Sequence, residues 1–218
     1  MLKSFISTPP KFPRLFHAAL LGLLMAAAPV HAQAQAQATA PDALVRQISV
    51  DVIEAAKADK QIQAGDFGRI IALVESKVLP SVNFETMTRS AVGPKWREAT
   101  PEQRSKLQAE FKTLLMRVYA GALTQVKDQT VEVTKTLPVA GSTQVVVQTE
   151  VRGKGEPLKL DYRLDNSVDA AWKIIDVNVA GIWLGRSYTS QFAAELNKGG
   201  IDGLIATLVA RNKPSGKS

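Results

Sequence analysis

Two spacings of apolar residues divide the chain into helical and extended regions. Between residues 42 and 126 the apolar positions recur every three or four residues, the spacing of a helix with one buried face. Between residues 130 and 180 they alternate with polar positions, as in a strand with one buried face. The helical spacing returns after residue 184. This order predicts an α+β protein.

Three helical regions are expected before residue 130. The first begins at Asp42, which is predicted to cap it, and runs to about Asp59. The second opens at Gly65-Asp66 and stops at Pro80, and residues 81–98 are expected to form short helical turns interrupted by Gly93-Pro94. The apolar stripe of the first helix consists of Leu44, Ile48, Val52 and Ala55.

The third helix has the clearest start. Thr100 is placed to cap it, Pro101 suits the first helical position, and Gln103 can complete a capping box. The helix is expected to reach about Val126. Its apolar stripe consists of Leu107, Phe111, Leu114, Leu115, Val118, Tyr119 and Ala122.

Four strands and two final helices complete the prediction. The strands are expected at 130–137, 143–152, 158–165 and 172–180, with hairpin turns at Pro138–Ser142 and Gly153–Pro157. Consecutive hairpins make an antiparallel sheet, which helices can cover on its apolar face. A break at Gly199-Gly200 divides the last helical region in two. The apolar surface exceeds what one sheet face needs, so it either packs solid or lines a cavity.

Residues 1–32 have the features of a cleaved secretory signal peptide. They combine a basic start, a short apolar stretch from Leu15 to Val30, and small residues before a cleavage site after Ala32. A retained membrane anchor is the alternative, although the stretch is short for a membrane span. Residues 33–41 are predicted to be a disordered leader, 42–212 a single domain, and 213–218 a flexible tail. The sequence therefore predicts export to the periplasm.

Removal of that segment changes the chemistry available. Residues 1–32 hold three of the 27 basic residues and none of the 20 acids, so the net charge falls from +7 to +4. This excess is too small to indicate nucleic-acid binding. Both histidines lie in the removed segment and the chain has no cysteine. Histidine-dependent nucleophilic catalysis, thiol redox chemistry, disulfides and ordinary zinc sites are thereby excluded, and no metal site is expected.

One acid stands out as a candidate for chemistry. Asp176 lies inside the apolar run Ile174–Val177, where burial is expected to raise its pKa and suit it to act as a general base on a hydrophobic molecule. The alternative is that it accepts structural hydrogen bonds. Glycines of the segment 153–155 are expected to serve a hairpin turn rather than a phosphate. An enzyme using Asp176 and a solid-core adaptor or chaperone are thus alternatives to an apolar-ligand carrier.

The chain resembles the MlaC, or toluene-tolerance, family over roughly residues 42–212. The resemblance rests on the order and spacing of several short segments rather than on one motif. These segments are Pro80–Phe84, Met87-Thr88, Gly93, Trp96-Arg97, Thr100–Arg104, Trp172–Val177, Gly181-Ile182, Tyr188, Ser190–Phe192 and Gly200–Ile205. Two positions depart from the pattern: Trp183 replaces a common serine and Thr189 a common arginine.

The resemblance implies a decorated NTF2-like cone that holds phospholipid acyl chains in an internal apolar cavity and leaves the headgroup outside. It implies a monomeric periplasmic carrier that needs no cofactor and catalyses no reaction. The implied partners are an outer-membrane lipoprotein–porin complex and the MCE-domain ring of an inner-membrane ABC transporter, with outer-membrane lipid asymmetry as the outcome. Arg89, Lys95 and Arg97 are either solvated charges or contacts for a phosphate at the cavity mouth.

The predicted lipid-binding residues come from the apolar face of the sheet, the turn that follows it, the third helix and the last helical region. They are Leu115, Val118, Tyr119, Val147, Val151, Leu160, Tyr162, Ile174, Ile182, Trp183, Tyr188 and Phe192.

Overall fold

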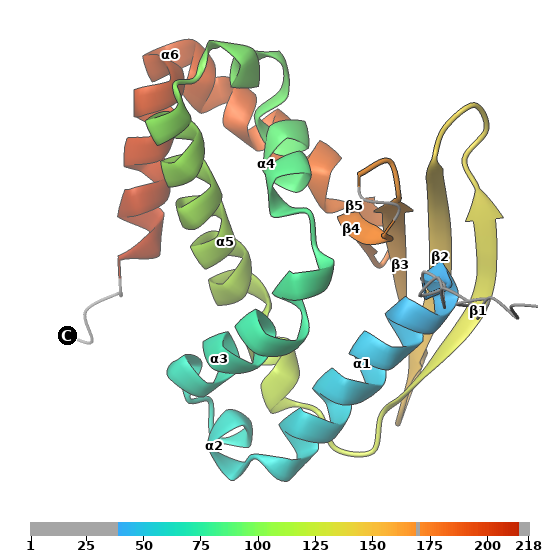
Figure 1. Cartoon of the computed structure of the whole chain (residues 1–218). Helices are drawn as coiled ribbons and strands as arrows, with labels where there is room; N and C mark the ends of the chain where they lie inside the picture. Colours follow the sequence, from blue (N-terminus) through green and yellow to red (C-terminus); the bar gives the residue numbers. More distant parts are fainter. Residues whose placement is uncertain (1–38, 169–170, 214–218) are drawn as a thin grey trace, which may run out of the picture. The chain divides into compact units, whose positions relative to one another are not determined.

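The computed structural model describes residues 39–168 and 171–213, which form several helices on one side of an antiparallel sheet (Figure 1). The helices are α1 (Pro41–Ala58), α2 (Lys60–Gln63), α3 (Phe67–Lys77), α4 (Phe84–Val92), α5 (Pro101–Thr124) and α6 (Leu184–Asn212), with 3₁₀ turns η1 (Leu79–Ser81) and η2 (Gly93–Glu98). The strands are β1 (Thr130–Pro138), β2 (Gln144–Arg152), β3 (Leu158–Asp165), β4 (Lys173–Val179) and β5 (Ile182–Trp183). None of the helices in these two ranges has the length and hydrophobicity that a membrane span requires.

The sheet confirms the predicted α+β class. Its strands follow chain order, β1 to β5, and every neighbouring pair is antiparallel. The four expected strands lie within one residue of their predicted ends. The two-residue β5 was not predicted, and it joins β4 through Ala180 and Gly181, whose φ angles are both positive, as a tight hairpin turn of type I′ requires.

A bulge between β3 and β4 decides which side chains of β4 face the helices. Leu164 pairs with Ile174, whereas Tyr162, two residues earlier, pairs with Val177. Partners across an antiparallel pair share a face, so Ile174 and Val177 lie on the same side although they are three positions apart. Asp176 pairs with Arg163 on the opposite side.

Helix α1 covers the sheet face that carries these apolar residues (Figure 1). Its Val45 is 1% exposed and packs in one cluster with Val147, Leu164 and Ile174. The helix begins at Pro41, one residue inside the predicted leader, and its N-cap is Ala40. The prediction that Asp42 caps the helix was therefore wrong: a proline at the first position starts the helix, and Asp42 lies in the first turn.

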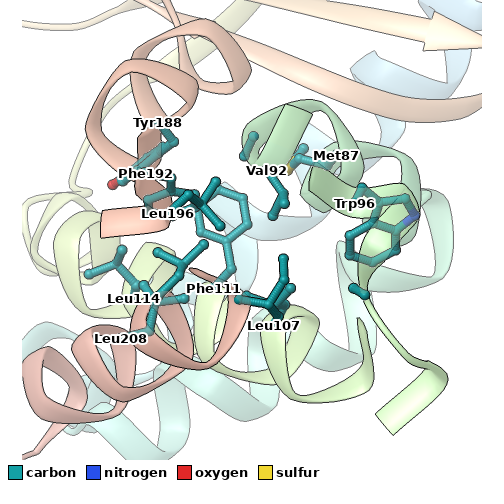
Figure 2. Close-up of a cluster of buried hydrophobic side chains, with 14 of the residues drawn as sticks. Met87, Val92, Trp96, Leu107, Phe111, Leu114, Tyr188, Phe192, Leu196 and Leu208 are labelled. Carbon is teal, nitrogen blue, oxygen red and sulfur yellow. The ribbon is translucent and has the colours of Figure 1, made fainter. Parts of the chain in front are cut away.

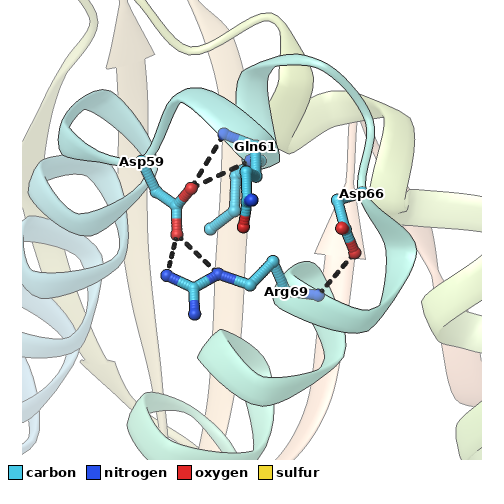
Figure 3. Close-up of polar contacts among 5 residues, drawn as sticks. Asp59, Gln61, Asp66 and Arg69 are labelled. Carbon is cyan, nitrogen blue, oxygen red and sulfur yellow. Dashed lines mark hydrogen bonds and ion pairs between the residues drawn. The ribbon is translucent and has the colours of Figure 1, made fainter.

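Side-chain caps set the starts of the next two helices (Figure 3). Asp59 accepts hydrogen bonds from the backbone of Gln61 and Ile62 at the start of α2, and Asp66 accepts one from Arg69 at the start of α3. The Arg69 side chain also pairs with Asp59 at 2.6 Å. Its guanidinium holds the pKa of the Asp59 carboxyl below its usual value. These bonds fix the sharp turn that brings α3 back beside α1.

Helices α4, α5 and α6 enclose a solid apolar core (Figure 2). Phe111 of α5 is fully buried, with ring centroids 4.9 Å from Tyr188 and 5.4 Å from Phe192 of α6. The predicted capping box of Thr100 and Gln103 starts α5. The predicted break in α6 is also present, since Gly200 has φ 63° and ψ −159°.

The predicted signal peptide (1–32), most of the leader and the tail from residue 214 lie outside the described residues. Residues 41–212 carry all of the helices and strands described.

Candidate functional site

A cavity of about 490 Å³ lies between α1 and the covered face of the sheet. Most of its wall is apolar, and the wall comes from α1, the region around η1, the end of α5 and four strands. Its apolar side chains are Ile48, Val52, Ile53, Val78, Val82, Ala122, Leu123, Val126, Val131, Val151, Leu158, Leu160, Tyr162, Ile174 and Val177. A volume of this size falls in the range of small-molecule sites.

A second cavity of about 300 Å³ lies between α3, α4 and α5. Leu115, Met116 and Tyr119 of α5 face it, with Ile70 and Val74 of α3 opposite. The two cavities share six wall residues, which we call the partition. The partition consists of Val52, Val78, Val82, Ala122, Leu123 and Val177. Because the two cavities share these wall residues, we describe the site as one apolar region with two lobes.

Polar groups are few on the deep wall of the larger cavity. Tyr162 of β3 and Ser49 of α1 both line it. Burial raises the pKa of the Tyr162 phenol above its usual value, although the hydrogen bond with Ser49 opposes the shift. The phenol therefore stays neutral at ordinary pH. The wall offers weak hydrogen-bonding groups and no charge at this depth, which suits an apolar occupant.

The rim of the larger cavity is polar. It is made by the α5–β1 loop, with Gln125 and Gln129, and by the β2–β3 hairpin, with Lys154 and Glu156. The side chain of Gln129 fastens its loop, since it donates to the Gln125 carbonyl and accepts from the Lys127 backbone. The site thus combines an apolar interior with a charged entrance.

One ion pair joins two helices that line the smaller cavity. Lys112 of α5 lines that cavity, and its Nζ lies 3.0 Å from Oε1 of Glu75 on α3. Both side chains are partly exposed. The pair joins the two helices that form opposite walls of this lobe.

Half of the twelve predicted lipid-binding residues line these cavities. Val151, Leu160, Tyr162 and Ile174 line the larger one, and Leu115 and Tyr119 line the smaller one. The structure brings these side chains together in one region, as expected from the sheet face and the α5 stripe. Lipid contact at each position stays a prediction.

The other six residues are not among those that line the two described cavities, and lipid contact at these positions also stays a prediction. Val147 is fully buried between α1 and the sheet, and Tyr188 and Phe192 belong to the solid core of α4, α5 and α6. Val118 is 54% exposed on α5 and Ile182 is 60% exposed beside the β4–β5 turn. Trp183 lines neither cavity, and Cζ of Arg163 lies over its ring, 4.5 Å from the ring centroid.

The candidate general base faces away from the cavity walls, on the side of β4 opposite Ile174 and Val177. Asp176 accepts hydrogen bonds from the backbone N–H groups of Val177 and Gly185, and so supports the first turn of α6. Burial raises the pKa of its carboxyl, while these donors and Arg163 oppose the shift. Asp176 is not among the residues that line the two described cavities. These contacts match the alternative in which Asp176 accepts structural hydrogen bonds.

The basic residues considered for the cavity mouth lie on α4 and η2. Arg89, Lys95 and Arg97 are exposed and line neither cavity, and Lys95 pairs with Glu98 at 2.8 Å. The charges at the entrance of the larger cavity come from the β2–β3 hairpin instead.

Sequence reasoning missed the contribution of α1 to the site. Ile48 and Val52 were recognised as an apolar stripe, but Ile53 was not, and none of them was assigned to the cavity. They are half-buried, whereas Val45 and Ala56 are buried. The sequence signal was the width of the apolar face of α1, which is wider than a helix needs to pack against the sheet along a single line.

Comparisons with known proteins identify relatives of the chain. The family model described as MlaC protein matches residues 46–210. A solved phospholipid-binding protein from Ralstonia solanacearum, in complex with a phospholipid, has 40% sequence identity and a TM-score of 0.75; the match covers 78% of this chain and 96% of that one.

Two more distant relatives have curated descriptions. Toluene tolerance protein Ttg2D of Pseudomonas putida is 27% identical over 166 residues, covering 76% of this chain and 77% of its own. The intermembrane phospholipid transport system binding protein MlaC of Haemophilus influenzae is 24% identical over 173 residues, covering 78% and 81%. The family match spans most of the chain and confirms the resemblance seen in the sequence. This chain therefore belongs to the MlaC family.

Proposed function

We propose that the protein is a phospholipid carrier that holds acyl chains in the two joined cavities and leaves the headgroup at the entrance. The observation that carries this proposal is the apolar region of about 490 and 300 Å³ between α1, α3, α5 and the sheet. The phospholipid bound to the Ralstonia solanacearum relative supports the same ligand class.

The physical case rests on the cost of exposing acyl chains to water. Two chains of about 15 methylenes, at about 0.8 kcal/mol each, amount to roughly 24 kcal/mol relative to water. A bilayer offers nearly the same stabilisation as an apolar cavity, so the exchange between them is close to balanced. The barrier is therefore the transient exposure of the chains, and docking to a membrane complex lowers it. No covalent step is required of the protein.

The carrier works in the periplasm and exchanges lipid with a complex in each membrane. The predicted signal peptide and the name of the Haemophilus influenzae relative support this placement. The partners are an outer-membrane lipoprotein–porin complex and the MCE-domain ring of an inner-membrane ABC transporter. Such exchange maintains the lipid asymmetry of the outer membrane.

The test is native mass spectrometry of the full chain isolated from a bacterial envelope without denaturation. The expected spectrum contains protein plus the mass of a phospholipid, and organic extraction recovers that lipid. Val177→Trp, which fills the partition, is expected to abolish the added mass. Val118→Trp is the matched control, because Val118 is exposed and lines neither cavity.

Two results would overturn the proposal. One is fresh wild-type protein that yields no lipid and transfers none between vesicles. The other is lipid loading that Val177→Trp leaves unchanged while the variant remains folded by circular dichroism.

A further inference from the structure

The entrance of the larger cavity is built from two segments that touch. A methyl group on Gly153 of the β2–β3 hairpin would lie 3.0 Å from Cγ of Gln129 in the α5–β1 loop. Absence of a side chain at Gly153 therefore allows the hairpin to lie against that loop. The hairpin that follows carries Lys154 and Glu156, and both line the cavity.

These two side chains carry opposite charges, and neither has an ion-pair or side-chain hydrogen-bond partner among residues 39–168 and 171–213. They do not pair with each other, although only Gly155 separates them; its φ of 105° turns the chain at that point. Lys57 of α1 does not line the cavity, but its Nζ donates to the carbonyl of the rim residue Gln129 at 3.0 Å. The rim thus presents one cation and one carboxylate.

We propose that this rim selects a zwitterionic phospholipid headgroup that carries a primary amine. Lys154 contacts the phosphate, and the Glu156 carboxylate accepts hydrogen bonds from the ammonium. The apolar walls do not distinguish headgroups, so discrimination falls to these charges. This inference rests on the proposed function.

The chemistry predicts an order among headgroups with identical acyl chains. Phosphatidylethanolamine satisfies both signs of charge and supplies N–H donors. Phosphatidylcholine supplies the positive charge without a donor, and phosphatidylglycerol leaves Glu156 without a cation. Partly solvated contacts of this kind change affinity by up to about fivefold.

The experiment loads lipid-free full-length protein from vesicles that contain equal amounts of the three lipids, and measures the bound species by native mass spectrometry. Wild-type protein is expected to favour phosphatidylethanolamine over phosphatidylglycerol by about threefold to fivefold. Phosphatidylcholine is expected to fall between them.

Substitutions of Lys154 and Glu156 test whether these two charges cause the headgroup preference. Glu156→Gln is expected to remove it, Glu156→Lys to invert it in favour of phosphatidylglycerol, and Lys154→Gln to weaken loading of all three lipids. Lys135→Gln and Glu54→Gln are matched controls, since both residues are exposed and line neither cavity.

Equal loading of the three lipids by wild-type protein overturns this inference and leaves the carrier function intact. The same holds if Glu156→Gln keeps the wild-type preference. Failure to load any lipid contradicts the proposed function itself, so the two failures are distinguishable.

Discussion

A carboxylate placed on the partition tests whether acyl chains fill both lobes. Val52 of α1 is half-buried and borders both cavities. Val52→Glu keeps the helix, since glutamate is a better helix former than valine. In lipid-free protein the new carboxylate is expected to remain hydrated in the open cavity, whereas bound acyl chains would displace that water.

The expected loss of affinity follows from the cost of a charge in hydrocarbon. A charged side chain at the centre of a hydrocarbon layer costs about 2.5–3.5 kcal/mol on insertion scales. This range corresponds to phospholipid binding that is about 60-fold to 300-fold weaker. Val52→Leu keeps the wall apolar and is expected to change affinity by less than about tenfold.

The assay is a titration of lipid-free protein with a fluorescent phospholipid analogue. Ala43→Glu serves as a control for the added charge, because Ala43 is exposed on the same helix and lines neither cavity. Circular dichroism establishes that each variant folds. Leu160→Glu, on the sheet side of the larger cavity, repeats the test if α1 does not tolerate the change.

Wild-type affinity in folded Val52→Glu and Leu160→Glu would refute the reasoning. Acyl chains would then have to lie outside the cavities, and the apolar walls would have only a structural role.

Three further predictions concern the ion pair, the buried acid and the break in α6. Glu75→Gln removes the ion-pair partner of Lys112. It is expected to speed lipid release to vesicles by up to about fivefold, because exposed ion pairs contribute up to about 1 kcal/mol. High salt should abolish the difference between variant and wild type, and equal release rates at low salt would contradict the prediction. Burial raises the pKa of Asp176 above its ordinary value of 3.8, so its contribution to stability is fully present below about pH 4 and is lost as pH rises through the raised pKa. Urea denaturation of lipid-free protein should therefore show that Asp176→Asn gains stability relative to wild type as the pH rises from about 3 to about 7. A relative loss of stability over that interval would mean that the Asp176 pKa is lowered in the folded protein rather than raised. Gly200→Ala is expected to lower the free energy of unfolding by about 1–3 kcal/mol, since its φ and ψ suit only glycine. Gly199→Ala meets no atom within 4 Å and is expected to raise it by about 0.4–1 kcal/mol; equal effects at the two positions would show that backbone conformation is not the cause.

Much of the fold follows from local signals in the sequence. Thr100 and Gln103 form their capping box because both partners lie within one turn. Gly200 breaks α6 where it was expected. The β3–β4 bulge carries no such signal, since it depends on how two strands align across the sheet. Only the structure shows that it directs Asp176 away from the face occupied by Val177.

The site was harder to predict than the fold. Helical spacing shows that Tyr188 and Phe192 face inward, but not whether they meet another helix or an open space. Phe111 fills the position opposite both rings, so they belong to solid core. Val151 and Leu160 line the larger cavity, as the alternation of apolar and polar positions along their strands suggests for a sheet with one covered face. That α1 covers it is a long-range arrangement that composition does not encode.

The residues of the partition also bear on how the lobes adapt to cargo of different width. Four of the six are valines, Val52, Val78, Val82 and Val177. Branching at Cβ restricts such side chains to few rotamers, so they cannot swing aside as methionine or leucine would. A bulkier occupant therefore requires displacement of the backbone segments that carry these valines, and the capacity of the protein is governed by how far those segments can move apart.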